Sequence, residues 1–112
     1  MTWFARVRAT IRELLGVTPT LDLHGLGVQA AVDQTERFLR DARSRGSRCV
    51  RIVYGKGRRS PGGRGVLREV IPRWLDTDGR ALVERYERRP DASGVDGAVV
   101  VWLYEASPRA DR

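Results

Sequence analysis

The spacing of apolar residues changes several times along the chain, and each change predicts a new element. Residues 3–15, WFARVRATIRELL, place apolar side chains three or four residues apart with arginines between them, which is typical of a short basic amphipathic helix. Residues 16–20, GVTPT, should end this helix, because Pro19 disfavours helical geometry at Thr18. We therefore expect residues 1–19 to form an N-terminal helix and a hinge.

The next segments alternate between strand and helix patterns. LDLHG, residues 21–25, has the two-residue period of a strand, and the residues that follow it have a helical period that stops at Gly46. SRCVRIVYG, residues 47–55, is rich in β-branched residues and predicts a second strand. VLREVIPRWL, residues 66–75, predicts a second helix, in which Pro72 should cause a kink or a tightened final turn.

Two further strands complete the pattern. They are RALVERYE, residues 80–87, and GAVVVWLY, residues 97–104, of which the latter is almost continuously apolar, as in the interior of a sheet. After the leading helix the order is βαβαββ, and right-handed crossovers place both main helices on one face of a four-stranded mixed sheet. We therefore predict a two-layer α/β sandwich over residues 20–104, followed by a flexible tail at 105–112.

The charge of the chain indicates a class of partner. The 112 residues include 21 Lys and Arg against 14 Asp and Glu, a net charge of +7. This excess favours nucleic acid as a partner, because guanidinium groups pair with phosphate oxygens, although an arginine-rich, GC-biased proteome would produce it too. The single cysteine, Cys49, excludes an internal disulfide and a multi-thiolate zinc site. Without a long apolar run or an uninterrupted signal-peptide core, we expect a soluble cytoplasmic protein that has no membrane partner.

The first strand ends on a carboxylate and on the only histidine of the chain. Because strand side chains alternate, Leu21 and Leu23 should pack under the helices, while Asp22 and His24 share the outward face. Ligands collect at the carboxyl ends of strands in open α/β sheets, and a carboxylate near an imidazole suits a general acid or base. On these two residues alone, a hydrogen-bonded histidine at a strand end explains the pair better than catalysis does.

A glycine-rich loop, GKGRRSPGGRG at residues 55–65, carries four cations and no acid. A right-handed crossover makes the two strands before it parallel, so this loop and His24 should emerge at one edge of the sheet. Glycine N–H groups and the N-terminus of the next helix are the parts of a phosphate cradle, although a solvated basic loop is an equally good interpretation. Gly63 stands where the P-loop motif requires lysine. The candidate phosphate-binding residues are Gly55, Lys56, Gly57, Arg58, Arg59 and Arg64.

Two aromatic residues are candidates for stacking on nucleobases. Tyr54 and Trp102 lie in or beside predicted strands, where aromatic side chains belong to the core more often than to a binding surface. We keep Tyr54 as the candidate base contact, because it directly precedes the glycine-rich loop. The sequence predicts no metal site.

Four stretches together resemble the Smr (small MutS-related) domain, in its stand-alone bacterial form. They are LDLHG, YGKG, GVLREVIPRWL and GVDGAVVVWL, in the order and spacing of that family, over roughly residues 20–104. The resemblance implies a βαβαββ fold similar to the C-terminal domain of bacterial translation initiation factor three, with the last strand inside the sheet. It also implies nucleic-acid binding and, as in several members, endonuclease activity on DNA or RNA.

By position, the resemblance assigns Asp22 and His24 to the catalytic motif and the GKG residues to the phosphate side. Tyr54 stands where many stand-alone members have histidine, so a mechanism with two histidines is in doubt. For RNA, His24 would act on the neighbouring 2′-OH, with Asp22 orienting it and no cofactor required. For DNA, water must be activated, and Asp22 with His24 would be a thin ligand set for Mg²⁺.

The sequence therefore leads to one preferred function and two alternatives. The preferred function is an endonuclease that cleaves or nicks RNA or DNA through Asp22 and His24, with a slight preference for RNA. The first alternative is a non-catalytic module that binds structured or branched nucleic acid or the ribosome. The second makes the N-terminal helix a docking element for a protein partner.

Overall fold

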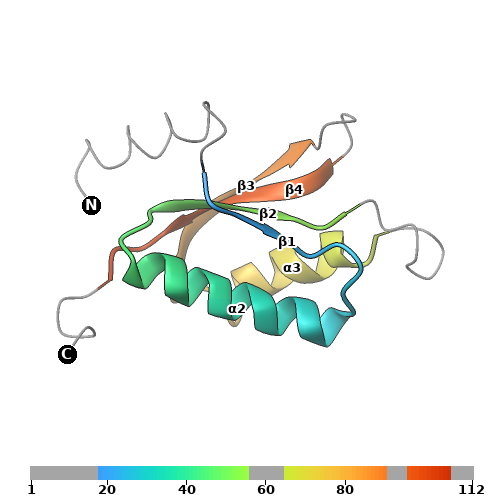
Figure 1. Cartoon of the computed structure of the whole chain (residues 1–112), viewed down its shortest axis with the longest axis horizontal. Coiled ribbons are helices and arrows are strands. Elements are labelled where there is room, and N and C mark those ends of the chain that lie inside the picture. Colours follow the sequence, from blue (N-terminus) through green and yellow to red (C-terminus); the bar gives the residue numbers. More distant parts are fainter. Residues whose placement is uncertain (1–17, 56–64, 91–95, 107–112) are drawn as a thin grey trace.

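The computed structural model describes residues 18–55, 65–90 and 96–106 of the chain. They form four strands and two helices in the predicted βαβαββ order (Figure 1). The elements are β1 (Thr20–Asp22), α2 (Val28–Ser44), β2 (Cys49–Val53), α3 (Leu67–Asp76), β3 (Val83–Pro90) and β4 (Asp96–Leu103). The helix predicted over residues 3–15 and most of the glycine-rich loop lie outside the described residues.

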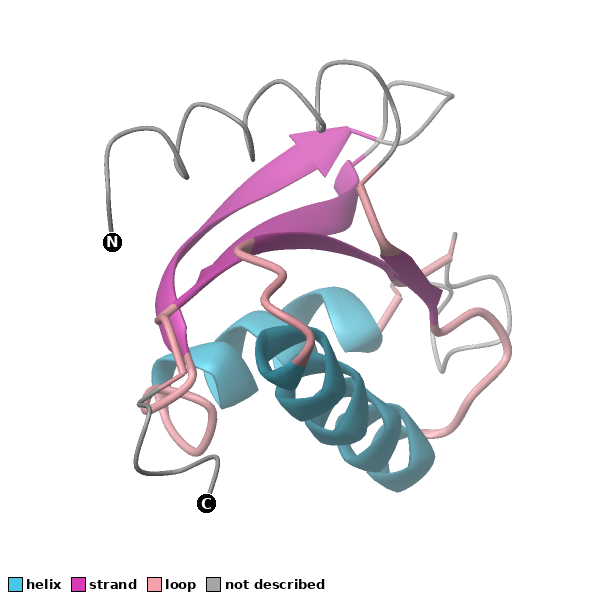
Figure 2. Cartoon of the chain, turned by 60° about the vertical axis from the view of Figure 1, so that its left-hand side comes forward, coloured by secondary structure: helices cyan, strands magenta, loops and turns pink. Residues whose placement is uncertain are grey.

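The four strands form one mixed sheet in the order β1-β2-β4-β3. β1 and β2 are parallel, whereas β4 is antiparallel to both β2 and β3. Both helices lie on the same side of this sheet (Figure 2). Because β4 is an interior strand, Val99, Val100 and Val101 are at most 1% exposed, which confirms the interpretation of its apolar run.

The core lies between the helices and the sheet. α2 contributes Ala31, Thr35, Leu39 and Ala42, which follow the predicted helical spacing and are all buried. Val28 begins the helix and is 42% exposed. The strands, with the residues directly after β1 and β2, supply Leu23, Val50, Ile52, Tyr54, Val83, Val99, Val101 and Leu103. α3 supplies Leu67, Ile71, Trp74 and Leu75.

The other side of the sheet, which we call the open face, is built from the residues that alternate with those core residues. Paired residues on neighbouring strands share a face, so the register defines its membership. The open face consists of Thr20, Asp22, Cys49, Arg51, Val53, Arg85, Glu87, Arg89, Ala98, Val100 and Trp102.

Two strand boundaries differ from the prediction. β1 ends at Asp22, because the chain turns immediately after it, with the Leu26 N–H donating to the Leu23 carbonyl at 3.0 Å. β3 covers Val83–Pro90 instead of residues 80–87. The shift arises because the chain after α3 first folds back under Trp74, whose ring would lie 2.5 Å from a Cβ added at Gly79.

Pro72 lies inside α3 without ending it. Proline lacks the N–H that would bond to the Arg68 carbonyl one turn earlier, and Arg88 Nη1 from β3 donates to that carbonyl instead, at 3.3 Å. The helix closes with a tightened turn, as predicted, since the Thr77 N–H reaches the carbonyl of Trp74, three residues back, at 3.2 Å. A neighbouring strand thus supplies the hydrogen bond that the proline removes.

In the part of the chain that the structure describes, neither helix has the length and apolar character needed to cross a membrane.

Candidate functional site

The carboxyl ends of β1 and β2 lie at the same edge of the sheet, because these strands are parallel. Both α2 and α3 begin at this edge (Figure 1), and the start of β4 joins it through a 2.9 Å hydrogen bond from the Tyr54 N–H to the Gly97 carbonyl. We call this edge the rim, and it comprises Asp22–His24, Val53–Gly55 and Gly97–Ala98. The rim is where sequence analysis expects the site.

Asp22 closes the turn that follows β1. Its Oδ1 accepts a 2.9 Å hydrogen bond from the main-chain N–H of His24. His24 was expected on the outward face of a five-residue strand, but the strand stops at Asp22 and His24 lies exposed in the turn beyond it. The Asp22 carboxylate therefore holds the main chain of His24, which fixes the point from which the imidazole projects.

His24 lies directly against the end of β2. Gly55 has φ +89°, and a Cβ added to it would lie 3.4 Å from Cα and Cβ of His24 and 3.5 Å from the imidazole Cδ2. Glycine at this position therefore serves both the left-handed conformation and the close approach. The expected convergence of LDLHG with the start of GKG at one edge is confirmed for His24 and Gly55.

The other predicted residues of the phosphate cradle are not described. Lys56, Gly57, Arg58, Arg59 and Arg64 all lie in residues 56–64, outside the described residues. Their roles stay predictions. The fixed point of that loop is Gly55, beside His24.

Tyr54 does not present its ring at the rim, so the prediction of a base contact is wrong. The side chain is 3% exposed and belongs to the core cluster that also contains Leu23. The physical reason is strand alternation, which turns Val53 toward the open face and Tyr54 toward the helices.

Sequence analysis missed an arginine at this edge. Asp22 pairs with Val53, Val53 with Ala98, and Ala98 with Arg89, so the four form one row across the open face. Arg89 lies 3.2 Å from Glu87 Oε2 through Nη2. It was assigned to a loop because β3 was expected to end at residue 87; extending the alternation of that strand to Pro90 would have found it.

The first turn of α2 adds positive potential at the rim. Its N-cap, Gly27, makes no side-chain capping hydrogen bond, and no acidic residue lies in the first turn. Unpaired N–H groups at a helix start carry a partial positive charge. In the described ranges, no group of three or more His, Cys, Asp or Glu side chains is arranged to hold a metal ion.

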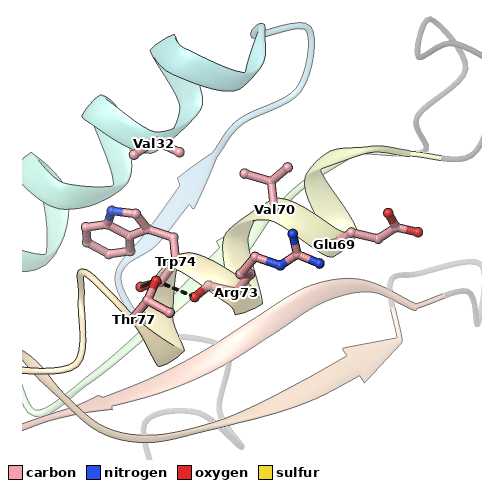
Figure 3. A pocket seen from close by; sticks show the side chains of 6 residues that line it. All are labelled: Val32, Glu69, Val70, Arg73, Trp74 and Thr77. Atoms are coloured by element: carbon pink, nitrogen blue, oxygen red, sulfur yellow. Dashed lines mark hydrogen bonds between the residues drawn. The ribbon is translucent and has the colours of Figure 1, made fainter.

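A groove of about 250 Å³ lies between α2 and α3, away from the open face (Figure 3). Its lining consists of Val32, Glu69, Val70, Arg73, Trp74 and Thr77. None of the predicted site residues that the structure describes lines it. The groove is therefore separate from the rim.

Relatives of known name match most of the described domain. Endonuclease MutS2 of Symbiobacterium thermophilum is 37% identical over 89 residues, and Endonuclease MutS2 of Thermus thermophilus is 35% identical over 83 residues. These alignments cover 80% and 74% of this chain but only 10% of each relative. The chain thus spans about a tenth of the length of the curated relatives it matches.

Solved structures match at the level of the whole domain. The crystal structure of the Smr domain of Thermus thermophilus MutS2 gives a TM-score of 0.64 at 33% identity, covering 78% of this chain and 99% of that one. YdaL, a stand-alone small MutS-related protein from Escherichia coli, gives a TM-score of 0.63 at 28% identity, covering 77% and 64%. The Smr domain family model matches residues 21–104. The chain belongs to the Smr domain family.

Proposed function

We propose that this chain binds nucleic acid at the rim and cleaves or nicks its phosphodiester backbone. One observation carries the proposal: a Cβ added at Gly55 would be in van der Waals contact with His24, so an imidazole and the first glycine of the basic loop share one edge. The name Endonuclease MutS2 of its relatives supports the reaction class. The matched segment is only 10% of each of those proteins, so their activity is proposed for this chain rather than transferred to it.

The phosphate would bind where the glycine-rich loop leaves β2. Main-chain N–H groups of Gly55–Gly57 would contact its oxygens, and Lys56, Arg58, Arg59 and Arg64 would supply the surrounding positive charge. Arg89 would extend this positive charge to the far end of the row that begins at Asp22. It lies about three strand spacings, or 14 Å, from Asp22. A nucleic-acid backbone held by the loop cations and by Arg89 would run along the rim and pass close to His24.

On RNA, His24 would take the proton of the 2′-OH beside the bound phosphate. The 2′-oxygen would then bond to phosphorus as the bond to the 5′-oxygen breaks, and the leaving oxygen would recover a proton from water or from the imidazolium. Loop cations would stabilise the charge that develops on phosphorus. Asp22 would act as a positioning residue, through its bond to the His24 main chain, and this route requires no cofactor.

On DNA no internal hydroxyl is available, so water would have to be the nucleophile. Asp22 and His24 could then contribute to holding Mg²⁺, which would supply an activated hydroxide. Two ligands are few for this ion, which is why we favour RNA.

A binding module without catalysis is the second candidate. It is favoured by the burial of Tyr54. Position 54 therefore offers the rim neither an exposed aromatic ring nor a second histidine. Such a module would recognise branched or structured nucleic acid or a ribosomal surface through the same cations.

Cleavage assays separate these functions. Wild type, His24→Ala, Asp22→Ala and the exposed control Gln34→Ala would be incubated with single-stranded RNA and with branched DNA, with and without EDTA. We expect His24→Ala to slow cleavage by about 10²–10⁴-fold while binding persists, and Gln34→Ala to match wild type. Cleavage by His24→Ala at the wild-type rate would refute the site, and tight binding without cleavage by wild type would identify a binding module.

Product ends identify the nucleophile. A 2′,3′-cyclic phosphate shows attack by the 2′-OH, whereas 5′-phosphate ends show attack by water. Replacing Lys56, Arg58 and Arg59 by alanine should weaken binding to all sequences and lower the salt slope by about 0.7–0.9 per lost phosphate contact. An unchanged slope would exclude this loop as the phosphate contact.

A further inference from the structure

The open face carries a second apolar cluster, separate from the core. It consists of Cys49, Val100 and Trp102, which are 5%, 1% and 5% exposed. Both helices lie on the other side of the sheet (Figure 2), so neither contributes to this burial. Values this low are typical of a covered sheet face rather than one that faces water.

Arg85 covers one part of this cluster. The Arg85 guanidinium lies 3.7 Å from the centre of the Trp102 ring, a cation–π contact that shields one face of the indole. Val100 is paired with Arg51 and Glu87, which flank it in the plane of the sheet. No element within residues 18–55, 65–90 or 96–106 crosses over it (Figure 2). The described helices and strands thus place no further layer over Val100, although it is 1% exposed.

The composition of the segments outside the described residues indicates which of them is apolar enough to pack on the open face. Residues 56–64, KGRRSPGGR, and 107–112, SPRADR, are dominated by Gly, Pro, Ser and charged residues, and 91–95 has a single large apolar residue, Val95. Residues 1–17 differ, because they hold four apolar residues at helical spacing. Those four are Phe4, Val7, Ile11 and Leu14.

We propose that residues 3–15 pack on the open face, with these four side chains on Cys49, Val100 and Trp102. The point of attachment fits, since the Pro19 carbonyl accepts a 2.9 Å hydrogen bond from the N–H of Arg51, itself a member of the open face. A helix of this length is about 20 Å long, and four strands are about 14 Å across. The segment is therefore long enough to cross the sheet from its hinge.

This packing would give the domain a third layer and change the character of its surface. In a helix with Phe4, Val7, Ile11 and Leu14 inward, Arg6 and Arg12 fall on the outward side and Arg8 flanks the apolar stripe. The surface on this side of the domain would thus change from an apolar sheet face to a basic helix face, which extends toward Arg89 beside the rim. The inference concerns packing, and it does not depend on the nuclease proposal.

The single cysteine makes the proposal directly testable in the full chain. Second cysteines would be introduced one at a time as Phe4→Cys, Val7→Cys, Ile11→Cys and Leu14→Cys, with Ala9→Cys and Arg12→Cys as matched controls, because both controls lie on the outward side of the same helix. A disulfide forms only when the two Cβ atoms come within about 4.5 Å. Under mild oxidation we expect at least one of the four inward variants to cross-link to Cys49 within one chain, and the one closest to the hinge to do so best. We expect neither control to cross-link.

Thiol labelling gives an independent measurement. Ile11→Asp should raise the labelling rate of Cys49 by about tenfold or more, because it disfavours the covered state, whereas Arg8→Gln should leave the rate unchanged. Absence of any intramolecular cross-link would overturn the proposal. So would cross-links that form only between chains, which indicate a second copy on this face. Fast wild-type labelling that only added RNA suppresses would also overturn it, since the face would then bind nucleic acid.

Discussion

Leu23 and His24 are consecutive residues that belong to two different regions of the molecule. Leu23 is fully buried in the core beneath the helices, whereas His24 lies exposed at the rim against Gly55. Strand alternation and the turn closed by Asp22 separate them. Stability and chemistry are thus carried by different side chains of one short motif, and each can be altered without the other.

The largest effect on stability is expected from Leu23→Ala. It removes a fully buried side chain and should lower the free energy of unfolding by about 2–5 kcal/mol. His24→Ala, at an exposed position, should change it by less than about 0.5 kcal/mol. Urea denaturation followed by circular dichroism measures both. Equal losses of unfolding free energy for the two variants would show that Leu23 and His24 contribute alike to stability, which would contradict their division between core and rim.

Gly55→Ala tests how closely the rim depends on glycine. The left-handed φ of +89° should cost an alanine about 1–2 kcal/mol, and the added methyl would lie in contact with His24, at 3.4 Å. Gly46→Ala is the matched control, because Gly46 has φ +85° with open space around it. We expect similar destabilisation of both variants, measured by urea denaturation, and impaired cleavage only for Gly55→Ala. Equal cleavage by the two would show that His24 tolerates the crowding.

Arg88 shows that a polar side chain can also contribute to stability. It lies on the helix-facing side of the sheet, in register with the core residue Val99. Its bond to the Arg68 carbonyl replaces the N–H that Pro72 lacks, so Arg88→Met should lower stability by about 1 kcal/mol. In a Pro72→Ala background the helix can supply that N–H, and the same substitution should have a smaller effect. A double-mutant cycle of thermal unfolding measures this difference. Identical effects in both backgrounds would rule out the compensation.

The smallest effect concerns pH. Burial of the Tyr86 phenol, and then its 2.9 Å hydrogen bond to Asp76 Oδ2, raise its pKa above the usual value of about 10. Above about pH 10 the unfolded chain therefore loses this proton before the folded chain does, and the free energy of unfolding falls as pH rises. Tyr86→Phe should lose less stability between about pH 9 and 11 than wild type, whereas the exposed control Tyr104→Phe should follow wild type. Parallel pH profiles for wild type and Tyr86→Phe would contradict the shift.

Most of the fold followed from local patterns. The βαβαββ order, the placement of both helices on one face and the interior position of β4 came from apolar period and crossover handedness. The ends of β1 and β3 did not, because they depend on the turn closed by Asp22 and on the packing of Gly79 beneath Trp74. Strand ends are set by contacts between segments, which no single window of sequence contains.

The candidate site divides in the same way. Sequence alone determined which chemistry is present: one histidine, one neighbouring carboxylate and a basic glycine-rich loop. Only the tertiary structure decided that Tyr54 belongs to the core, that Arg89 joins the rim row and that His24 lies against Gly55. Side-chain type is a local property of the chain, whereas proximity is created when parallel strands bring residues thirty positions apart to one edge.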